Sequence, residues 1–203
     1  MKKFDINNKD CYLKIMKNLF IFDFFGVICN EVSEEWAKKY CKKEDALKLR
    51  AEIFDKSDVG LIDVYGVVEK LAEYTHLSTQ KITEEFLNAA KINQRTLDIM
   101  QQLRKKHKVA VLSNAPKGML EIIFPPKKLL DYADIVVISY QEKIAKPNPE
   151  IYQKTIAKFD EKFDQIFMID DRQKNLDPMI KMGYQGVLFT TPEALKAELT
   201  EYL

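Results

Sequence analysis

The stretch Leu19–Cys29 reads LFIFDFFGVIC, and its first four residues are all apolar. Neighbouring side chains of a strand point to opposite faces, so an unbroken apolar run predicts a strand that is covered on both faces. We expect this strand over Leu19–Asp23, with a carboxylate at its carboxyl end. Strands of this kind are typical of parallel sheets with helices on both sides.

The lysine-rich residues 1–17 before this run look superficially like the start of a secretory signal peptide. Asp23 argues against that interpretation, because an ionised carboxylate inside the apolar segment is costly, and no Ala-x-Ala cleavage site follows. No run reaches the ~18 apolar residues that a membrane span needs. We therefore expect a cytoplasmic protein with no membrane association.

Four more short apolar runs repeat the pattern, over Val109–Ser113, Ile135–Ser139, Ile166–Asp170 and Gly186–Thr190. Helical patterns alternate with them: Leu97, Met100 and Leu103 share one face, a second helix is expected after Pro149, and a Thr190–Glu193 capping box is expected to open a third. This alternation predicts an α/β fold with a doubly wound, Rossmann-like parallel sheet.

Residues 31–93 depart from this alternation of strands and helices, because no strand is evident there while amphipathic helical patterns recur. Helices of ordinary length, ~10–14 residues, would give three or four in this interval. The block lies between the first two strands, so we expect an inserted helical cap over the strand ends, where ligands of such sheets bind. Residues 18–30 and 94–203 are then expected to form the core.

The composition excludes several classes of protein. Among 203 residues, 32 Lys and Arg nearly balance 31 Asp and Glu, and the net charge of +1 provides no global field to attract nucleic acid. Cys11, Cys29 and Cys41 form no CxxC pair, and we expect reduced thiols. His76 and His107 are the only histidines, which argues against catalysis by a Ser–His or Cys–His pair.

Polar side chains that could carry chemistry follow four of the predicted strands. They are Asp23, Ser113 with Asn114, Lys146, and Asp170 with Asp171. Any one of them could be a solvated strand end or a helix cap, and for Ser113 alone we would favour that interpretation. Because the carboxyl ends of parallel strands meet in one crevice, four such positions together favour a shared site.

The charges at this edge indicate what the site would bind. Asp23, Asp170 and Asp171 carry three negative charges against the single positive charge of Lys146. At least one carboxylate would have to take up a proton unless a cation is bound. Oxygen ligands without His or Cys favour a hard ion, and Mg²⁺ is the usual partner when phosphate completes its coordination.

A bound Mg²⁺ would offset the excess negative charge, so that a phosphate dianion could bind at the same edge. Ser113, Asn114 and Lys146 would then donate to its oxygens, and Asp23 would be left as a possible nucleophile. The sequence therefore predicts a Mg²⁺ cofactor, a small phosphorylated substrate and phosphoryl transfer to a carboxylate.

Four segments resemble, in order, the motifs of the haloacid dehalogenase superfamily. They are FIFDFFGVI (20–28), VLSNAP (111–116), KIAKPNPEIY (143–152) and FMIDDRQKN (167–175). The nearest branch looks like the helical-cap phosphatases of the sugar-phosphatase and epoxide-hydrolase N-terminal type. The likeness covers residues 18–190, and residues 1–17 match nothing in it, so we expect them to be an N-terminal extension.

The resemblance assigns roles to the residues around the phosphoryl group. It implies that Asp23 is the nucleophile and becomes an aspartyl-phosphate. Ser113 and Asn114 would bind the phosphoryl oxygens, and Lys146 would neutralise both nucleophile and phosphate.

The resemblance also implies a set of magnesium ligands. Asp171 would bind the metal directly, with Asp170 as its close support and Asn175 orienting both. The Asp23 carboxylate and the backbone carbonyl of Phe25 would complete the protein's share. Which of the two neighbouring aspartates binds directly varies within the superfamily.

Phe25 departs from the pattern, because most phosphatases of the superfamily carry an acid/base Asp at that position. We therefore expect slow turnover and a steep preference for good leaving groups. Glu31, Glu34 and Glu35 are candidates to replace the missing acid, although solvated helix acids are the plainer interpretation.

The leading interpretation is a Mg²⁺-dependent phosphatase of a small phosphorylated metabolite. The alternative is a catalytically impaired member that binds a phosphorylated ligand or partner, and Phe25 is its best support. A response-regulator receiver domain would carry its paired acids after the first strand and would lack the helical insertion. Dehalogenases typically lack the metal-binding pair Asp170–Asp171.

Overall fold

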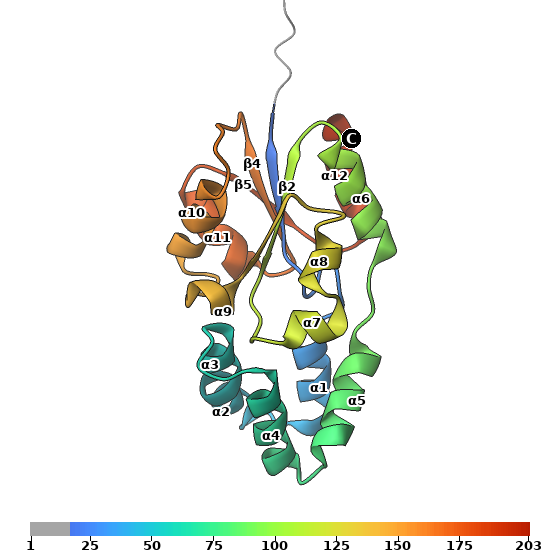
Figure 1. Ribbon diagram of the computed structural model, residues 1–203, viewed down its shortest axis with the longest axis vertical. Helices are drawn as coiled ribbons and strands as arrows, with labels where there is room; N and C mark the ends of the chain where they lie inside the picture. Colours follow the sequence, from blue (N-terminus) through green and yellow to red (C-terminus); the bar gives the residue numbers. More distant parts are fainter. Residues whose placement is uncertain (1–16) are drawn as a thin grey trace, which may run out of the picture.

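The computed structural model describes residues 17–203 (Figure 1). Most of the expected N-terminal extension, residues 1–16, lies outside the described residues. Five parallel strands form one sheet in the order β3-β2-β1-β4-β5. They span Leu19–Phe22 (β1), Lys108–Ser113 (β2), Ile135–Ile138 (β3), Ile166–Asp170 (β4) and Gln185–Leu188 (β5). The predicted doubly wound sheet is therefore confirmed, with β1 at its centre.

The apolar side chains of β1 belong alternately to two hydrophobic cores, one on each face of the sheet. Phe20 and Phe22 are fully buried on one face, where they join a cluster that includes residues of α6 and α12. Leu19 and Ile21 are fully buried on the other face, in a cluster with residues of α10 and α11. A strand buried on both faces needs apolar side chains at every position, which is why the sequence shows no alternation.

Helices flank both faces of the sheet, and α10 and α11 lie on the side opposite α6 and α12 (Figure 1). The bounds are Gln94–Arg104 (α6), Met119–Ile123 (α7), Pro126–Leu129 (α8), Ser139–Glu142 (α9), Pro149–Ala157 (α10), Gln173–Lys181 (α11) and Pro192–Glu198 (α12), with a final 3₁₀ turn at Thr200–Tyr202 (η2).

The start of α12 corrects one detail of the expectation. The N-cap is Thr191, whose side chain accepts a hydrogen bond from the Ala194 N–H at 3.1 Å, and Thr190 is not the cap. Glu193 forms an ion pair with Arg95 of α6, so it does not close a capping box with Thr190. The residue immediately before Pro192 takes the capping role because Pro is favoured at the first helical position.

Residues 32–89, here called the helical block, contain helices and turns only. The elements are α1 (Val32–Tyr40), α2 (Ala46–Leu49), a π-helical turn η1 (Arg50–Phe54), α3 (Asp55–Asp58), α4 (Val64–Thr75) and α5 (Thr79–Ala89). The block lies beyond the carboxyl ends of the strands (Figure 1). The division of the chain into a core and a cap stays a prediction, although the expected helices are present.

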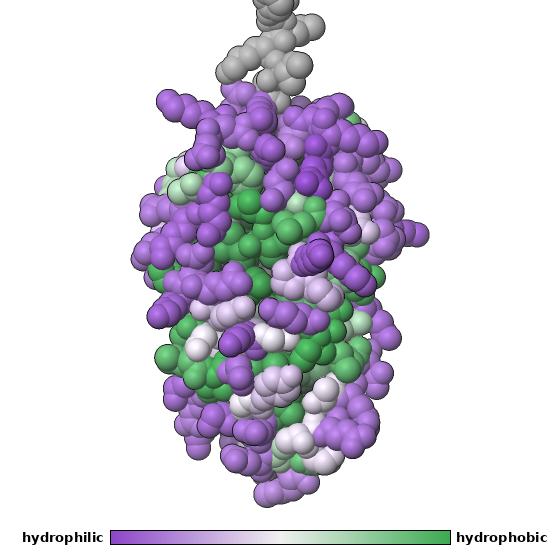
Figure 2. Space-filling model, in the orientation of Figure 1, coloured by the Kyte–Doolittle hydropathy of each residue, from purple (hydrophilic) through white to green (hydrophobic). Residues whose placement is uncertain are grey.

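The face seen in Figure 2 is largely hydrophilic, with hydrophobic residues showing across its middle. Within residues 17–203, none of the helices has both the length and the apolar character required to cross a bilayer.

Candidate active site

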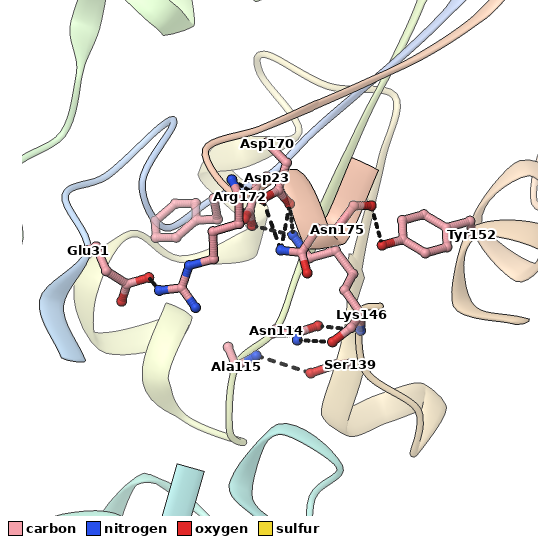
Figure 3. Close-up of polar contacts among 11 residues, drawn as sticks. Asp23, Glu31, Asn114, Ala115, Ser139, Lys146, Tyr152, Asp170, Arg172 and Asn175 are labelled. Atoms are coloured by element: carbon pink, nitrogen blue, oxygen red, sulfur yellow. Dashed lines mark hydrogen bonds and ion pairs between the residues drawn. The ribbon is translucent and has the colours of Figure 1, made fainter. Parts of the chain in front are cut away.

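Three carboxylates and one ammonium group converge at the carboxyl edge of the sheet. Figure 3 shows two of these carboxylates, Asp23 and Asp170, together with Lys146. Asp23 follows β1, Asp170 ends β4, and Asp171 comes directly after it. Oxygen atoms of these three side chains all lie within 4.8 Å of one another. The Lys146 Nζ lies 2.7 Å from both Asp23 Oδ1 and Asp170 Oδ2. The sequence-based grouping of these residues therefore corresponds to real proximity, whereas their roles stay predictions.

The Asp170 carboxylate is fully engaged by donors from the protein. Lys146 donates to Oδ2, the Arg172 backbone N–H donates to Oδ1 at 3.0 Å, and the Asn175 amide donates to both oxygens at 2.9 and 3.1 Å. The Tyr152 hydroxyl donates to the Asn175 backbone carbonyl at 2.6 Å and so fixes that residue. This contact gives a physical reason for the tyrosine that ends the segment KIAKPNPEIY.

Asp171 differs, because its Oδ1 is buried and has no hydrogen-bond partner within the described chain. The backbone of Gly26 makes room for this side chain: a Cβ on Gly26 would lie 2.3 Å from the Asp171 Cγ. A buried acceptor without a donor is costly unless a ligand satisfies it. The oxygen-only donor set of Asp23, Asp170 and Asp171 therefore fits a hard divalent cation.

The charges of the site perturb the pKa values of its acids. Burial raises the pKa of Asp23 well above its ordinary value, and the Asp170 carboxylate adds to that rise against the opposing effect of Lys146. Burial and Asp170 raise the pKa of Asp171 to about 6. Burial alone would also raise the pKa of Asp170, but Lys146 holds it below the ordinary value. One ammonium group is thus too little positive charge for these three carboxylates, two of which are buried.

Lys146 is buried, with 5% of its surface exposed, and its charge depends on its partners. Burial disfavours the ammonium form, but Asp23 and Asp170 together raise the pKa of Lys146 above its ordinary value. Asn114 fixes the backbone beneath it: the Asn114 amide donates to the Lys146 carbonyl, and the Lys146 N–H donates to the Asn114 Oδ1, both at 2.9 Å.

The Asn114 amide uses its oxygen and one N–H on the backbone of Lys146 and keeps a second N–H, so its contact with phosphoryl oxygens stays a prediction. Its contacts are those of a positioning residue for Lys146. Ser113 retains the character of a ligand-binding group, since its Oγ is fully buried and lacks a hydrogen-bond partner among residues 17–203. Ser139 was not singled out from the sequence, yet its hydroxyl accepts from the Ala115 N–H at 3.1 Å and supports the turn after Ser113.

A cavity of about 90 Å³ lies between the core and the helical block. The core contributes Asp23, Phe25 and Lys146 to its walls, and the block contributes aromatic and polar side chains, among them Phe54 and Asp58. Ser113, Asp170 and Asp171 do not belong to the walls that residues 17–203 provide. The small volume suits a compact ligand.

Phe25 lines this cavity and packs edge-on against Phe24, with ring centroids 5.0 Å apart. No carboxylate therefore occupies the place two residues after Asp23. Of the acids considered as substitutes, Glu31 and Glu34 form ion pairs with Arg172, the second at 2.7 Å. Arg172 was not singled out from the sequence, and it joins the core to the start of the helical block.

Residues 17–183 match the haloacid dehalogenase-like hydrolase family. A D-ribitol-5-phosphate phosphatase from Bacteroides thetaiotaomicron is 25% identical in an alignment 189 residues long, and the match covers 84% of this chain and 90% of that protein.

Solved structures agree with this match. A haloacid dehalogenase family enzyme from B. thetaiotaomicron has the same fold, with a TM-score of 0.73, 23% identity, and coverage of 91% of this chain and 98% of that one. The wild-type enzyme in complex with magnesium and inorganic phosphate gives a TM-score of 0.67 at 27% identity, covering 86% and 94% of the two chains. The family match over most of the chain is decisive: this protein belongs to the haloacid dehalogenase-like hydrolases.

Proposed function

We propose that this hydrolase is a Mg²⁺-dependent phosphatase that transfers the phosphoryl group of a small substrate to Asp23. The observation that carries the proposal is the position of Lys146, whose ammonium group bridges Asp23 and Asp170 at 2.7 Å each, beside the cavity. A buried cation at the nucleophile would stabilise charge that develops on a phosphoryl group. The related phosphatase supports the same class of reaction.

The residues of the site fit a magnesium ion. Asp171 would bind it through the oxygen that has no partner among residues 17–203, together with the Asp23 carboxylate and the backbone carbonyl of Phe25. Asp170, already held by Lys146 and Asn175, would support Asp171. When bound, the metal would neutralise the excess negative charge and hold a phosphoryl oxygen.

The chemistry proposed for the chain's own groups has two steps. In the first, an Asp23 oxygen attacks phosphorus, the bond from phosphorus to the leaving oxygen breaks, and that oxygen takes up a proton. In the second, water attacks the phosphorus of phospho-Asp23, loses a proton, and releases inorganic phosphate and the Asp23 carboxylate. Lys146 and the free Ser113 hydroxyl would donate to the phosphoryl oxygens in both steps.

The substrate class is proposed to be a phosphorylated metabolite of modest size. The cavity is small, and the related enzyme acts on D-ribitol 5-phosphate, so sugar and sugar-alcohol phosphates are the first compounds to assay. We also propose that residues 31–93 act as a cap on a core made of residues 18–30 and 94–203, because the helical block supplies one wall of the cavity.

A panel of phosphate esters, assayed with and without Mg²⁺ beside an Asp23→Asn variant, tests the proposal. Turnover should require both the metal and Asp23. Phe25 favours one other candidate, a member that binds phosphorylated ligands without turnover. Binding of phosphate esters with no turnover above the Asp23→Asn background would support that candidate and contradict the phosphatase.

A further inference from the structure

The helical block contributes one carboxylate to the cavity that the proposed nucleophile also lines. Asp58 is the last residue of α3, and it lines the same cavity as Asp23, Phe25 and Lys146. The chain just after it is packed on the core, since a Cβ on Gly60 would lie 3.0 Å from the Tyr140 carbonyl oxygen. This close approach to α9 holds the end of α3 over the site.

The Asp58 carboxylate makes no hydrogen bond or ion pair with any residue between 17 and 203. The other acids near it are engaged: Glu31 and Glu34 pair with Arg172, and Asp55 lies 3.3 Å from the Arg50 Nε. Asp58 is therefore the acid on this wall that is free to exchange a proton with a ligand.

The surroundings of Asp58 favour proton exchange near neutral pH. Burial raises the pKa of Asp58 to about 6, and the nearby carboxylates of Asp55 and Glu31 add to the rise. Arg50 and Lys146 oppose it, and Arg172 and Lys174 are two further cations lining the cavity. A carboxyl group with a pKa close to the working pH can both donate and accept a proton.

We propose that Asp58 is the general acid and base of the reaction, supplied by the helical block in place of the carboxylate that is missing at Phe25. This inference rests on the proposed phosphatase function. In the first step, the Asp58 carboxyl gives its proton to the leaving oxygen as the bond to phosphorus breaks. In the second step, the Asp58 carboxylate takes the proton of the water that attacks phospho-Asp23, and both groups return to their initial states.

Asp58 in this role would supply the acid that is absent at Phe25, so slow turnover would not follow from Phe25 alone. This role also gives the helical block a catalytic function, because proton transfer requires α3 to lie over the core. If Asp58 only bound a substrate hydroxyl, its removal would lower kcat/KM to an extent set by the shape of each substrate. If it is a general acid, its removal lowers kcat/KM most for the substrates whose leaving group most needs a proton.

The experiment compares Asp58→Asn with wild type on p-nitrophenyl phosphate, whose leaving group needs no proton, and on alkyl phosphates that wild type hydrolyses. For alkyl esters, kcat/KM should fall by ~10²-fold or more, the usual scale for a positioned acid. For p-nitrophenyl phosphate, kcat/KM should hold while kcat falls, with a burst of p-nitrophenol, because phospho-Asp23 forms normally and hydrolyses slowly.

Glu52→Gln is the matched control, since it removes an exposed acid from the adjoining turn η1 that does not line this cavity. It should behave as wild type, and all variants should show similar thermal unfolding. Equal losses on both ester types, or no loss on either, would overturn the role of Asp58 while Asp23-dependent turnover persists. Turnover that survives in Asp23→Asn would instead overturn the proposed function itself.

Discussion

Gly26 leaves the space that Asp171 occupies, because a Cβ at Gly26 would lie only 2.3 Å from the Asp171 Cγ. Gly26 also has a φ of +85°, a conformation that L side chains rarely adopt. Two constraints thus meet at one residue of the turn that follows Asp23. Glycine is needed at position 26 both to adopt the positive φ and to leave space for the Asp171 carboxylate.

Gly26→Ala should therefore lose both stability and the Mg²⁺ site. Gly183→Ala separates the two effects, since Gly183 has a similar φ of +87° but no described atom within 4 Å of its Cβ position. Each variant should lose about 1–2 kcal/mol of unfolding free energy from the left-handed conformation. Only Gly26→Ala should also lose the rise in melting temperature on adding Mg²⁺, and equal Mg²⁺ responses would contradict the account.

Asp171→Asn should raise the Mg²⁺ concentration needed for half-maximal activity by at least ~10-fold, the lower end of what even outer-sphere partners of a metal contribute. The control is Asp177→Asn, an exposed acid of α11 that accepts only from Gln173 within the described part of the chain. Metal titration of activity is the measurement, and excess chelator should abolish turnover in every variant. Full activity of wild type in chelator would argue against a metal-dependent reaction.

Lys146→Met should reduce kcat/KM by ~10²-fold or more, the scale for losing one preorganised donor. The unfolding free energy should also fall, because breaking a buried ion pair leaves Asp23 and Asp170 uncompensated, and Mg²⁺ should restore part of it. Lys154→Met on α10 should change little, since its pairs with Glu142 and Glu150 lie at the surface. Normal activity per folded molecule in Lys146→Met would make Lys146 a structural residue only.

Phe25→Asp should restore proton transfer to Asp58→Asn. Phe25 lines the same cavity as Asp58, so an aspartate there would reach the reacting group from the core. We expect the double variant to recover at least part of the lost kcat/KM on alkyl phosphates. The measurement is the dependence of kcat/KM on the leaving group for the single and double variants. If the double variant shows the same dependence as Asp58→Asn, an aspartate at position 25 does not replace Asp58.

Much of the fold and of the site could be predicted from the sequence, because both depend on short local patterns. The buried strand at Leu19–Phe22 requires apolar residues on both faces, and the groups that end the strands must meet at one edge of a parallel sheet. Asp23, Asp170 and Lys146 could therefore be grouped before any contact between them was known.

The remainder depends on contacts between segments far apart in the chain. Asp58 lies in a short polar segment whose pattern does not indicate where α3 packs, so nothing local marks it as part of the site. The pair of Arg172 and Glu31 could not be predicted either, because the two residues are 141 positions apart in the chain. The cap of α12 was misplaced by one residue, because Thr190 and Thr191 are equally good caps and the geometry before Pro192 selects the second.

The central claim is that Asp23 carries the phosphoryl group during turnover, and mass spectrometry of acid-quenched protein tests it most directly. Wild type and Asp58→Asn are mixed with p-nitrophenyl phosphate and Mg²⁺, quenched within the first turnovers, and digested. The account predicts one added phosphoryl group on the peptide that contains Asp23, more of it in Asp58→Asn, and none in Asp23→Asn or in chelator. Full turnover by Asp23→Asn, or a phosphoryl group found on another residue, would contradict it.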